Sequence, residues 1–309
     1  MALTLPESAK MSSGDVVKSA VIEQYARTSD VLRVIQWQNI MGNAIKFNRE
    51  GSLGGIGFRG VNEAYTESSG ILTPMTEPLV IAGGDLDVDN FIIDTQGASV
   101  RSTYEMMKVK ALALAWTKAF IKGDSDANSS EFDGLQERLV GDQLISSGST
   151  QAGDPLSLLK LDELIDAVNG ANYLIMNKTM RRLLTSASRL ATVGGTVTFG
   201  TDEFGKGMTM YNGLPILIAD EDETGTQILP FTEEAYTSGG AASSSIYCVN
   251  FEEGYLNGIQ ANEMAVKDLG ELDTKPVMRT RIDWYNSICI YDARAAARLY
   301  GISNTTVTV

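Results

Sequence analysis

The sequence of 309 residues contains no histidine and only two cysteines. Histidine is the commonest general base and the commonest neutral metal ligand, so its absence removes the usual basis for acid–base catalysis and zinc binding. Cys248 and Cys289 lie in the apolar segments SIYCVNF and NSICIYD, which are typical of buried strands. We expect inert core thiols in a reducing compartment, although one disulfide is an open alternative. We predict no catalytic residue, no cofactor and no metal site.

Long hydrophobic runs are also missing. The most apolar stretch, ALALAWT at 111–117, is far shorter than the roughly 20 residues that a helix needs to cross a bilayer. The first twelve residues contain Glu7 and Lys10 and lack an apolar block, so we expect neither a signal peptide nor a membrane span. Hydrophobic residues nevertheless make up 43% of the chain and charged residues 21%. This composition predicts a folded chain of about two domains.

Positive charge is scarce, and the formal net charge is −14. The stretch 200–275 holds 14 Asp or Glu against 3 Lys or Arg, so a net charge of −11 lies in one quarter of the chain. A strongly acidic protein repels nucleic acid rather than binding it. The charge therefore argues against a nucleic-acid-binding protein, but it does not by itself indicate a function.

Glycine is concentrated in GGIGFRG at 54–60, where Gly55, Gly57 and Gly60 have the spacing of the dinucleotide-binding fingerprint. That fingerprint requires a helix directly after the glycines, because the amides at the helix N-terminus hold the pyrophosphate. The following segment, VNEAYTESSGILTP, has no apolar residues at helical spacing and contains Gly70 and a proline. We therefore predict a long flexible hairpin or arm at this position instead of a cofactor site.

Two further segments resemble ligand-binding loops without meeting their requirements. GTDEFGKG at 200–207 has the glycines and lysine of a nucleotide-binding P-loop, but Gly207 replaces the magnesium-binding Ser or Thr. DLDVDN at 85–90 resembles the start of a calcium loop, but Asn90 and Gln96 replace its glycine and its bidentate glutamate. Alternating apolar residues in this second segment predict a strand with one solvated face.

The first half of the chain contains one strong helical pattern. DVVKSAVIEQYAR at 15–27 predicts a modest helix, and DVLRVIQWQNI at 30–40 predicts strand-like material. The strongest helix lies in SVRSTYEMMKVKALALAWTKAFIKGD and ends at Gly123. Two apolar stripes along it predict contact with two different surfaces. The first consists of Met106, Val109, Leu112, Ala113, Trp116 and Phe120, and the second of Met107, Leu114 and Ile121.

From about 150 to 265 the pattern alternates between helices and strands, which predicts a small α/β domain. PLSLLKLDELIDAVN, beginning at Pro155, and KTMRRLLTSASRL predict helices, whereas ANYLIMN, LPILIAD and SIYCVNF predict strands. TSGGAASSS at 237–245 is expected to be a solvent-exposed loop. After about residue 275 the sequence predicts long strands that return to the region beside the long helix.

The order of these parts resembles the major capsid proteins of tailed bacteriophages, which share the Hong Kong 97-type shell fold with encapsulins. FIKGDSDANSSEFDGL resembles the loop after the long helix of that family, and NYLIMNKTMRRLL resembles its strand-then-helix signature. NGLPILIAD is similar to its Gly-x-Pro-Val strand. FEEGYLNGIQ and SICIYDARAAARLYGI are similar to its late strands.

The resemblance implies an α+β fold with five parts. These are an N-terminal arm at 1–45, an extended loop at 46–95, a peripheral domain with a long spine helix at 96–150, an axial α/β domain at 151–265, and a return to the peripheral domain at 266–309. It implies a structural subunit, not an enzyme, that assembles with itself into the pentamers and hexamers of an icosahedral shell around double-stranded DNA. The alternatives are an encapsulin-type compartment and, further away, an acidic soluble enzyme.

The same resemblance implies partners and a location. We expect a separate scaffolding protein and a portal, with decoration proteins as a further possibility, and a chain that assembles in the bacterial host cytoplasm and ends in the virion capsid. DNA would be enclosed without sequence-specific binding, and no membrane would be involved. Some members crosslink their subunits through a loop lysine. This chain has no lysine between Lys46 and Lys108, so we expect non-covalent joints.

Candidate contacts between subunits lie on the glycine-rich excursion, because an extended loop of this family lies over a neighbouring subunit. The charged candidates are Arg49, Arg59, Glu63 and Glu67, and the apolar candidates are Leu53, Ile56 and Phe58. For the charged residues, solvation of an exposed hairpin is an almost equally good interpretation, because exposed ion pairs contribute only about 0–1 kcal/mol each.

Overall fold

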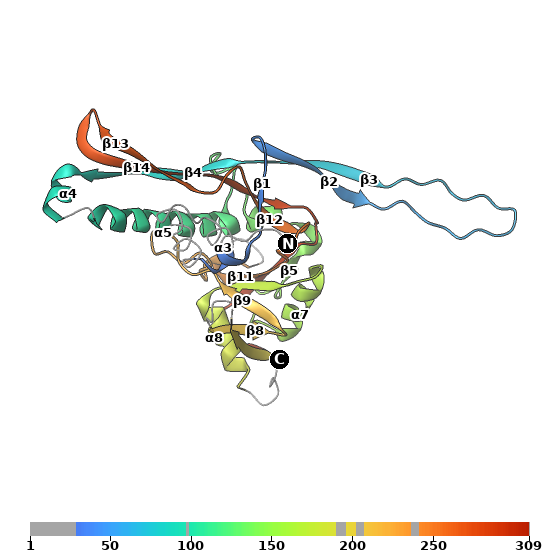
Figure 1. The fold of residues 1–309 in the computed structure, drawn as a ribbon. Helices are drawn as coiled ribbons and strands as arrows, with labels where there is room; N and C mark the ends of the chain where they lie inside the picture. Colours follow the sequence, from blue (N-terminus) through green and yellow to red (C-terminus); the bar gives the residue numbers. More distant parts are fainter. Residues whose placement is uncertain (1–28, 97–98, 190–195, 202–206, 236–240, 309) are drawn as a thin grey trace.

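The computed structural model describes residues 29–96, 99–189, 196–201, 207–235 and 241–308. The helix expected over residues 15–27 lies outside the described residues. Figure 1 shows an elongated upper layer that contains a long helix and a twisted sheet, a wedge below this layer, and a hairpin that projects away from the body. Helices and mixed sheets are combined in one α+β architecture, as the sequence predicts.

The long helix of the upper layer is α5 (Ser99–Lys122). Its buried side chains Val109, Ala113, Trp116 and Phe120 recur every three or four residues, which places them along one helix face. The first apolar stripe is therefore confirmed as a buried face at these four residues. The second stripe is divided, because Ile121 is buried, Leu114 is half-buried and Met107 is exposed.

A five-stranded sheet lies against α5. Its strands are β1 (Trp37–Asn39), β4 (Val80–Asp89), β12 (Leu256–Gln260), β13 (Ala265–Leu272) and the long β14 (Lys275–Ile290). The order is β1-β12-β14-β13, and β4 pairs with the other edge of β14. Close pairing depends on Gly83, since a Cβ there would lie 2.1 Å from the carbonyl oxygen of Ile282. The short helix α4 (Asn90–Gln96) follows β4 and precedes α5.

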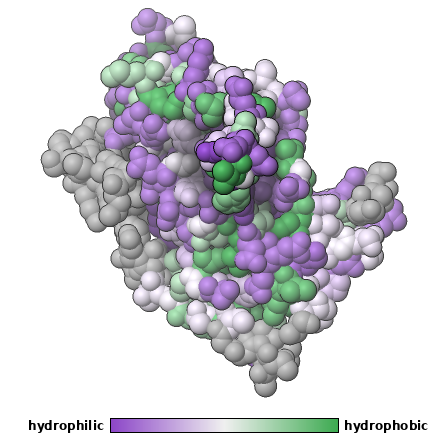
Figure 2. Space-filling view, turned by 90° about the vertical axis from the view of Figure 1, so that its right-hand side faces the viewer, coloured by the Kyte–Doolittle hydropathy of each residue, from purple (hydrophilic) through white to green (hydrophobic). Residues whose placement is uncertain are grey.

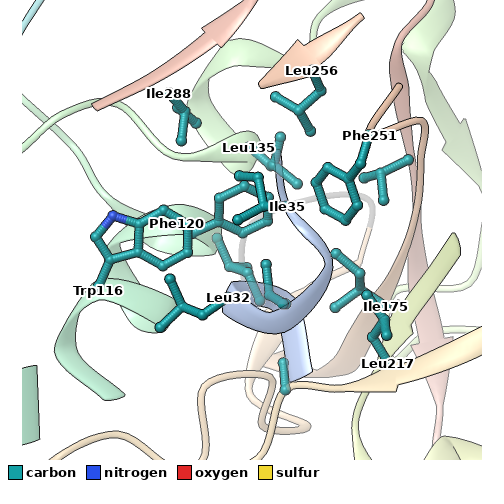
Figure 3. Close-up of a cluster of buried hydrophobic side chains, with 14 of the residues drawn as sticks. Leu32, Ile35, Trp116, Phe120, Leu135, Ile175, Leu217, Phe251, Leu256 and Ile288 are labelled. Carbon is teal, nitrogen blue, oxygen red and sulfur yellow. The ribbon is translucent and has the colours of Figure 1, made fainter. Parts of the chain in front are cut away.

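Three tryptophans form the centre of the core between α5 and this sheet. The ring centroids of Trp37 and Trp284 are 4.7 Å apart, and those of Trp37 and Trp116 are 5.4 Å apart. Two of the three indole nitrogens donate to side chains of the sheet, whereas the buried Nε1 of Trp37 has no partner among the described residues. Trp116 Nε1 donates to Asn286 Oδ1 at 2.9 Å, and Trp284 Nε1 donates to Gln260 Oε1 at 3.0 Å. Figure 3 shows how Phe120 continues this cluster toward the wedge.

The segment expected to be strand-like at 30–40 begins instead with a short helix, α3 (Asp30–Val34). Ser29 accepts a hydrogen bond from the amide of Leu32 and so caps this helix. Leu32 and Ile35 are fully buried beside Phe120 (Figure 3). The prediction was wrong for residues 30–34 because a polar cap, together with tertiary burial of one face, overrides the β preference of the valines.

The wedge is built on a mixed eight-stranded sheet. Along the main path the order is β5 (Leu144–Ser146), β15 (Ala296–Ser303), β11 (Ala241–Val249), β6 (Tyr173–Met176), β9 (Leu214–Ile218), β8 (Gly207–Tyr211) and β7 (Val197–Thr201), and β10 (Glu233–Glu234) pairs with β11. Helices α7 (Leu158–Ala167) and α8 (Lys178–Ala187) supply buried leucines and a methionine to a second core on this sheet. The predicted alternation of helices and strands is therefore confirmed.

Two local expectations in the wedge were wrong. Helix α7 begins at Leu158 and not at Pro155, because residues 154–157 lie in short bridges to the end of the chain. Residues 241–245 belong to strand β11, and Ser243, Ser244 and Ser245 are buried rather than solvent-exposed. Their hydroxyls are satisfied inside the protein; for example, Ser243 donates to the carbonyl oxygen of Glu233 at 2.8 Å.

The expected segment boundaries also differ from the sheets. Strand β4, inside the expected loop at 46–95, belongs to the five-stranded sheet, and so does β12, inside the expected domain at 151–265. Strand β15, inside the expected return at 266–309, pairs with β11 and β5 in the wedge. Long-range strand pairing decides which sheet each of these segments joins, and local sequence patterns do not indicate that pairing.

The two cysteines are buried and free, as expected. Burial raises the pKa of each thiol to about 12. A thiolate is the reactive form of cysteine, so both residues are inert at neutral pH.

Candidate assembly surface

The hairpin in Figure 1 consists of β2 (Ala44–Ser52) and β3 (Ile71–Pro78), joined by the loop 53–70. We call this whole unit, residues 44–78, the arm. The strands pair antiparallel from Ala44 opposite Pro78 to Glu50 opposite Leu72. The loop leads into β3 and not into a helix, so the glycine triplet lacks the helix that a dinucleotide site requires. The predicted hairpin is confirmed.

The base of the arm is fixed to the body by side chains. Glu77 in β3 is only 7% exposed, and its two carboxylate oxygens accept from the two terminal nitrogens of Arg138 at 2.5 and 2.8 Å. Arg138 ends the short helix α6 (Leu135–Arg138) and also donates to the carbonyl oxygen of Asp133. A buried bidentate ion pair of this kind fixes the relative orientation of the two side chains as well as their distance. The arm therefore leaves the body at a defined angle.

Strand β2 is attached at the same place. Arg49 donates to the carbonyl oxygen of Ile290, and the rings of Phe47 and Tyr291 meet edge to face at 4.9 Å. Arg49, predicted to contact another subunit, thus has a partner in its own chain. The attachment of the arm accounts for the position of Arg49, and a contact between Arg49 and a second copy stays a prediction.

The tip of the arm is held by local contacts. The amide of Gly60 donates to Glu63 Oε2 at 2.9 Å, and Arg59 donates to the carbonyl oxygen of Glu63 at 3.1 Å. The Arg59 guanidinium also lies 5.0 Å from the ring centre of Tyr65. Ser68 donates across the loop to the carbonyl oxygen of Gly55 at 2.6 Å. Two predicted contact residues, Arg59 and Glu63, are therefore brought together, and they shape the tip.

The apolar side chains of the tip have no cover. Leu53 is 81% exposed, and Ile56 and Phe58 are almost completely exposed. The charged Glu67 is also exposed. Further apolar residues that the sequence prediction did not name are exposed nearby, namely Val61, Tyr65, Ile71 and Leu72. Figure 2 shows green hydrophobic atoms beside purple ones on the end of the arm that points to the viewer. Clustered apolar exposure of this kind marks an interaction surface.

The two edges of the arm differ in their capacity to pair. Proline has no amide hydrogen, so Pro74 and Pro78 cannot donate a hydrogen bond to β2. Each lies opposite a β2 residue in a pair whose backbone polar groups point away from the partner strand. The outer edge of β3 consequently lacks donors at two positions, whereas β2 contains no proline. Prolines at an edge discourage the addition of a further strand. The exposed arm is therefore protected on one side against indiscriminate sheet extension.

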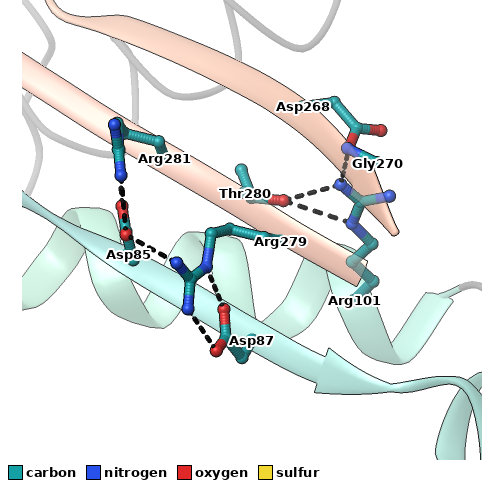
Figure 4. A network of polar contacts seen from close by, with 8 residues as sticks. All are labelled: Asp85, Asp87, Arg101, Asp268, Gly270, Arg279, Thr280 and Arg281. Carbon is teal, nitrogen blue, oxygen red and sulfur yellow. Dashed lines mark hydrogen bonds and ion pairs between the residues drawn. The ribbon is translucent and has the colours of Figure 1, made fainter. Parts of the chain in front are cut away.

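The opposite end of the upper layer is held by a polar network, drawn in Figure 4. Arg281 pairs with Asp85 at 2.7 Å and Arg279 with Asp87 at 2.6 Å, across β14 and β4. Hydrogen bonds from these guanidinium groups lower the pKa of Asp85 and of Asp87. Two of the three carboxylates of the calcium-like segment are therefore occupied by arginine, and the third, on Asp89, accepts from the amide of Phe91. The segment is a strand, as the alternating pattern predicted.

Helix α5 is tied to the same network. Arg101 pairs with Asp268 of β13 at 2.6 Å and donates to Thr280 Oγ1 of β14 at 2.7 Å, and Thr280 in turn donates to Glu105 at 2.7 Å. These contacts connect the start of the helix to two strands (Figure 4). Phe91 of α4, together with Met106 and Met107 of α5, is exposed near this end.

The described residues offer no grouping that points to metal or membrane chemistry. Within them, no three Cys, Asp or Glu side chains gather where they could hold a metal ion. Among the helices of the described chain, none is both long and apolar enough to span a bilayer. What distinguishes the surface is the arm, which is anchored at its base and apolar at its tip.

No protein-family model matches the sequence, and no curated protein matches it. Solved structures match most of the chain. A chain of the holo-SrpI encapsulin complex from Synechococcus elongatus PCC 7942 has a TM-score of 0.63 at 15% identity and covers 90% of this chain and 89% of its own. The capsid of an empty GTA particle has a TM-score of 0.61 at 17% identity, with 89% and 90% covered. A structure from Microbacterium phage Oxtober96 has a TM-score of 0.61 at 11% identity and 91% coverage of both chains.

The likeness extends over about nine tenths of this chain and of each of these chains. At these identities it identifies the fold. The chain has the Hong Kong 97-type capsid fold, as the order of the sequence motifs indicated.

Proposed function

We propose that this protein is a structural subunit of a closed shell built from many copies of itself. The observation that carries the proposal is the arm, whose base is fixed by the Glu77–Arg138 pair while the apolar side chains around Ile56 and Phe58 are left uncovered. An identical copy beside it is the simplest surface that could cover them. The similar solved structures, which include capsid and encapsulin chains, support the same role.

In its finer form the proposal is an icosahedral viral shell of pentamers and hexamers that encloses double-stranded DNA. The arm would lie over a neighbouring subunit, the upper layer would form the wall, and the wedges would gather around the local axes. The net charge of −14 suits a container whose wall does not adhere to the DNA inside it. A scaffolding protein, a portal and decoration proteins would be further partners, and the assembled chain would belong to the virion.

An encapsulin-type compartment is the second candidate, because an encapsulin chain and capsid chains match with similar scores. Both candidates are non-enzymatic. The third reading of the sequence, an acidic enzyme, has no support from a catalytic grouping among the residues that the structure describes.

Electron microscopy of the purified full-length protein tests the proposal, with and without a co-expressed scaffolding protein. Closed particles of uniform diameter are the expected result. Particle diameter and nucleic-acid content then separate the two candidates, since a phage shell should be larger and able to contain DNA. A small, stable oligomer under every condition, with the arm protected from proteolysis by its own body, would contradict the proposal.

A further inference from the structure

Two helices of the wedge carry opposite charge on their outer faces. On α8, Arg181 and Arg182 are exposed one turn after Lys178, at the spacing that places side chains along one helix face. Lys178 is paired with Asp220. Neither Arg181 nor Arg182 has a side-chain partner within the part of the chain that the structure describes. In a chain with a net charge of −14, two adjacent exposed arginines that have no partner among the described residues need an explanation.

The outer face of α7 is acidic. Asp162, Glu163 and Asp166 are exposed along it, and the exposed Leu159 lies on the same face. Asp162 accepts a hydrogen bond from the Tyr211 hydroxyl, and Glu163 pairs with Lys160 at 2.6 Å. With Lys160 counted, the face has a net charge of −2. The Arg294 guanidinium donates to the carbonyl oxygens of Asp166 and Ala167, and with Arg294 counted as well the net charge is −1.

The two faces lie on different sides of the wedge. Helix α7 packs on β15 and β11, toward one end of the sheet order, whereas α8 connects β6 to β9 farther along it. In Figure 1, α7 lies on the side from which the arm projects, and α8 lies on the other side. Copies placed around an axis in the same sense would set the α7 side of one against the α8 side of the next.

We infer that the basic face of α8, carried by Arg181 and Arg182, docks on the acidic α7 face of a second copy of this chain, carried by Glu163 and Asp166. The inference rests on the proposed function and adds to it how neighbouring copies are oriented. The contact joins two different surfaces, so it is head-to-tail and closes into a ring when the rotation between copies allows it. The neighbour on the α7 side is the same copy over which the arm would reach.

Charge also explains why this contact discriminates between orientations. A copy turned around would oppose two acidic faces or two basic faces, and like charges in close contact are unfavourable. The attraction acts over about 8 Å at physiological ionic strength. Leu159, at the start of the acidic face, adds apolar surface that the contact would cover.

Charge reversal on each face tests this inference in the full-length protein. The double variant Arg181→Glu with Arg182→Glu, and the reciprocal double variant Glu163→Arg with Asp166→Arg, should each lower the yield of closed particles at least tenfold. The quadruple variant, with both faces reversed, should restore at least half of the wild-type yield. A matched control for the arginine variant, Lys110→Glu with Lys275→Glu, makes the same change in net charge elsewhere and should assemble like the wild type.

Thermal unfolding of every variant checks that the subunit still folds, which is expected because all of the replaced side chains are exposed. Particles at wild-type yield from either double variant would overturn the inference and leave the shell proposal standing. Failure of the quadruple variant to recover, or an equal loss in the control, would also overturn it. Absence of particles from the wild-type chain with and without scaffold would instead refute the proposed function itself.

Discussion

Replacement of Ile56 and Phe58 by serine removes two apolar side chains that the folded subunit does not bury. Both side chains are almost completely exposed, so their loss should leave the unfolding temperature of the isolated subunit unchanged. In an assembled shell, full burial of each is worth about 1.5–3 kcal/mol. The double variant should therefore weaken each arm contact by roughly 3–6 kcal/mol, which corresponds to at least a hundredfold loss in its equilibrium constant.

The assay is particle formation as a function of subunit concentration, followed by light scattering and checked by electron microscopy. Val140→Ser is the matched control, because Val140 is an exposed apolar residue outside the arm. The control should assemble at the wild-type concentration, and the double variant should not assemble within a hundredfold of it. If the double variant forms shells at the wild-type concentration, the tip is not a contact surface and the reasoning fails.

Four further outcomes are expected. Glu77→Ala leaves a buried guanidinium without its partner, so it should lower the free energy of unfolding by about 3 kcal/mol in urea titrations, whereas Glu50→Ala at an exposed position of the arm should change it little. Gly83→Ala places a Cβ 2.1 Å from the carbonyl oxygen of Ile282 and should destabilise the subunit by about 1–3 kcal/mol or more; Gly57→Ala, with open space around it, is the control. Both cysteine thiols have a pKa of about 12 in the folded chain. They should therefore react with a thiol reagent at pH 8 roughly a thousandfold more slowly than in urea, and equal rates would show that they are not buried. Denaturing electrophoresis of assembled particles should give one band near 33.3 kDa, and a ladder of larger species would disprove non-covalent joints.

The sequence predicts best those elements whose cause is local. Helix α5 has both a strong apolar period and a terminating glycine, and its bounds agree with the structure within a residue or two. The hairpin was predicted for the right reason, because the segment after Gly60 cannot form the helix that a cofactor loop needs. Leu53, Ile56 and Phe58 are exposed at the tip, as a contact surface requires, and their contact with a second copy stays a prediction.

Features with a long-range cause were not accessible in the same way. The serines at 243–245 appear polar in sequence, yet β11 is paired on both sides by β15 and β6, which buries them. Strand β15 could have joined either sheet from its sequence alone. The attachment of Arg49 to the carbonyl oxygen of Ile290 joins residues that are 241 positions apart, and no local pattern indicates such a contact.

The separation between a fixed base and an uncovered tip has a consequence for assembly. Two complete hydrophobic cores and the polar network around Arg101 stabilise the subunit without help from the arm tip. Folding and assembly therefore depend on different residues. Ordering a mobile segment on binding consumes part of the interaction free energy. Because Glu77 and Arg138 already set the direction of the arm, less of the energy gained by covering Phe58 is lost in this way, and more of it stabilises the contact between copies.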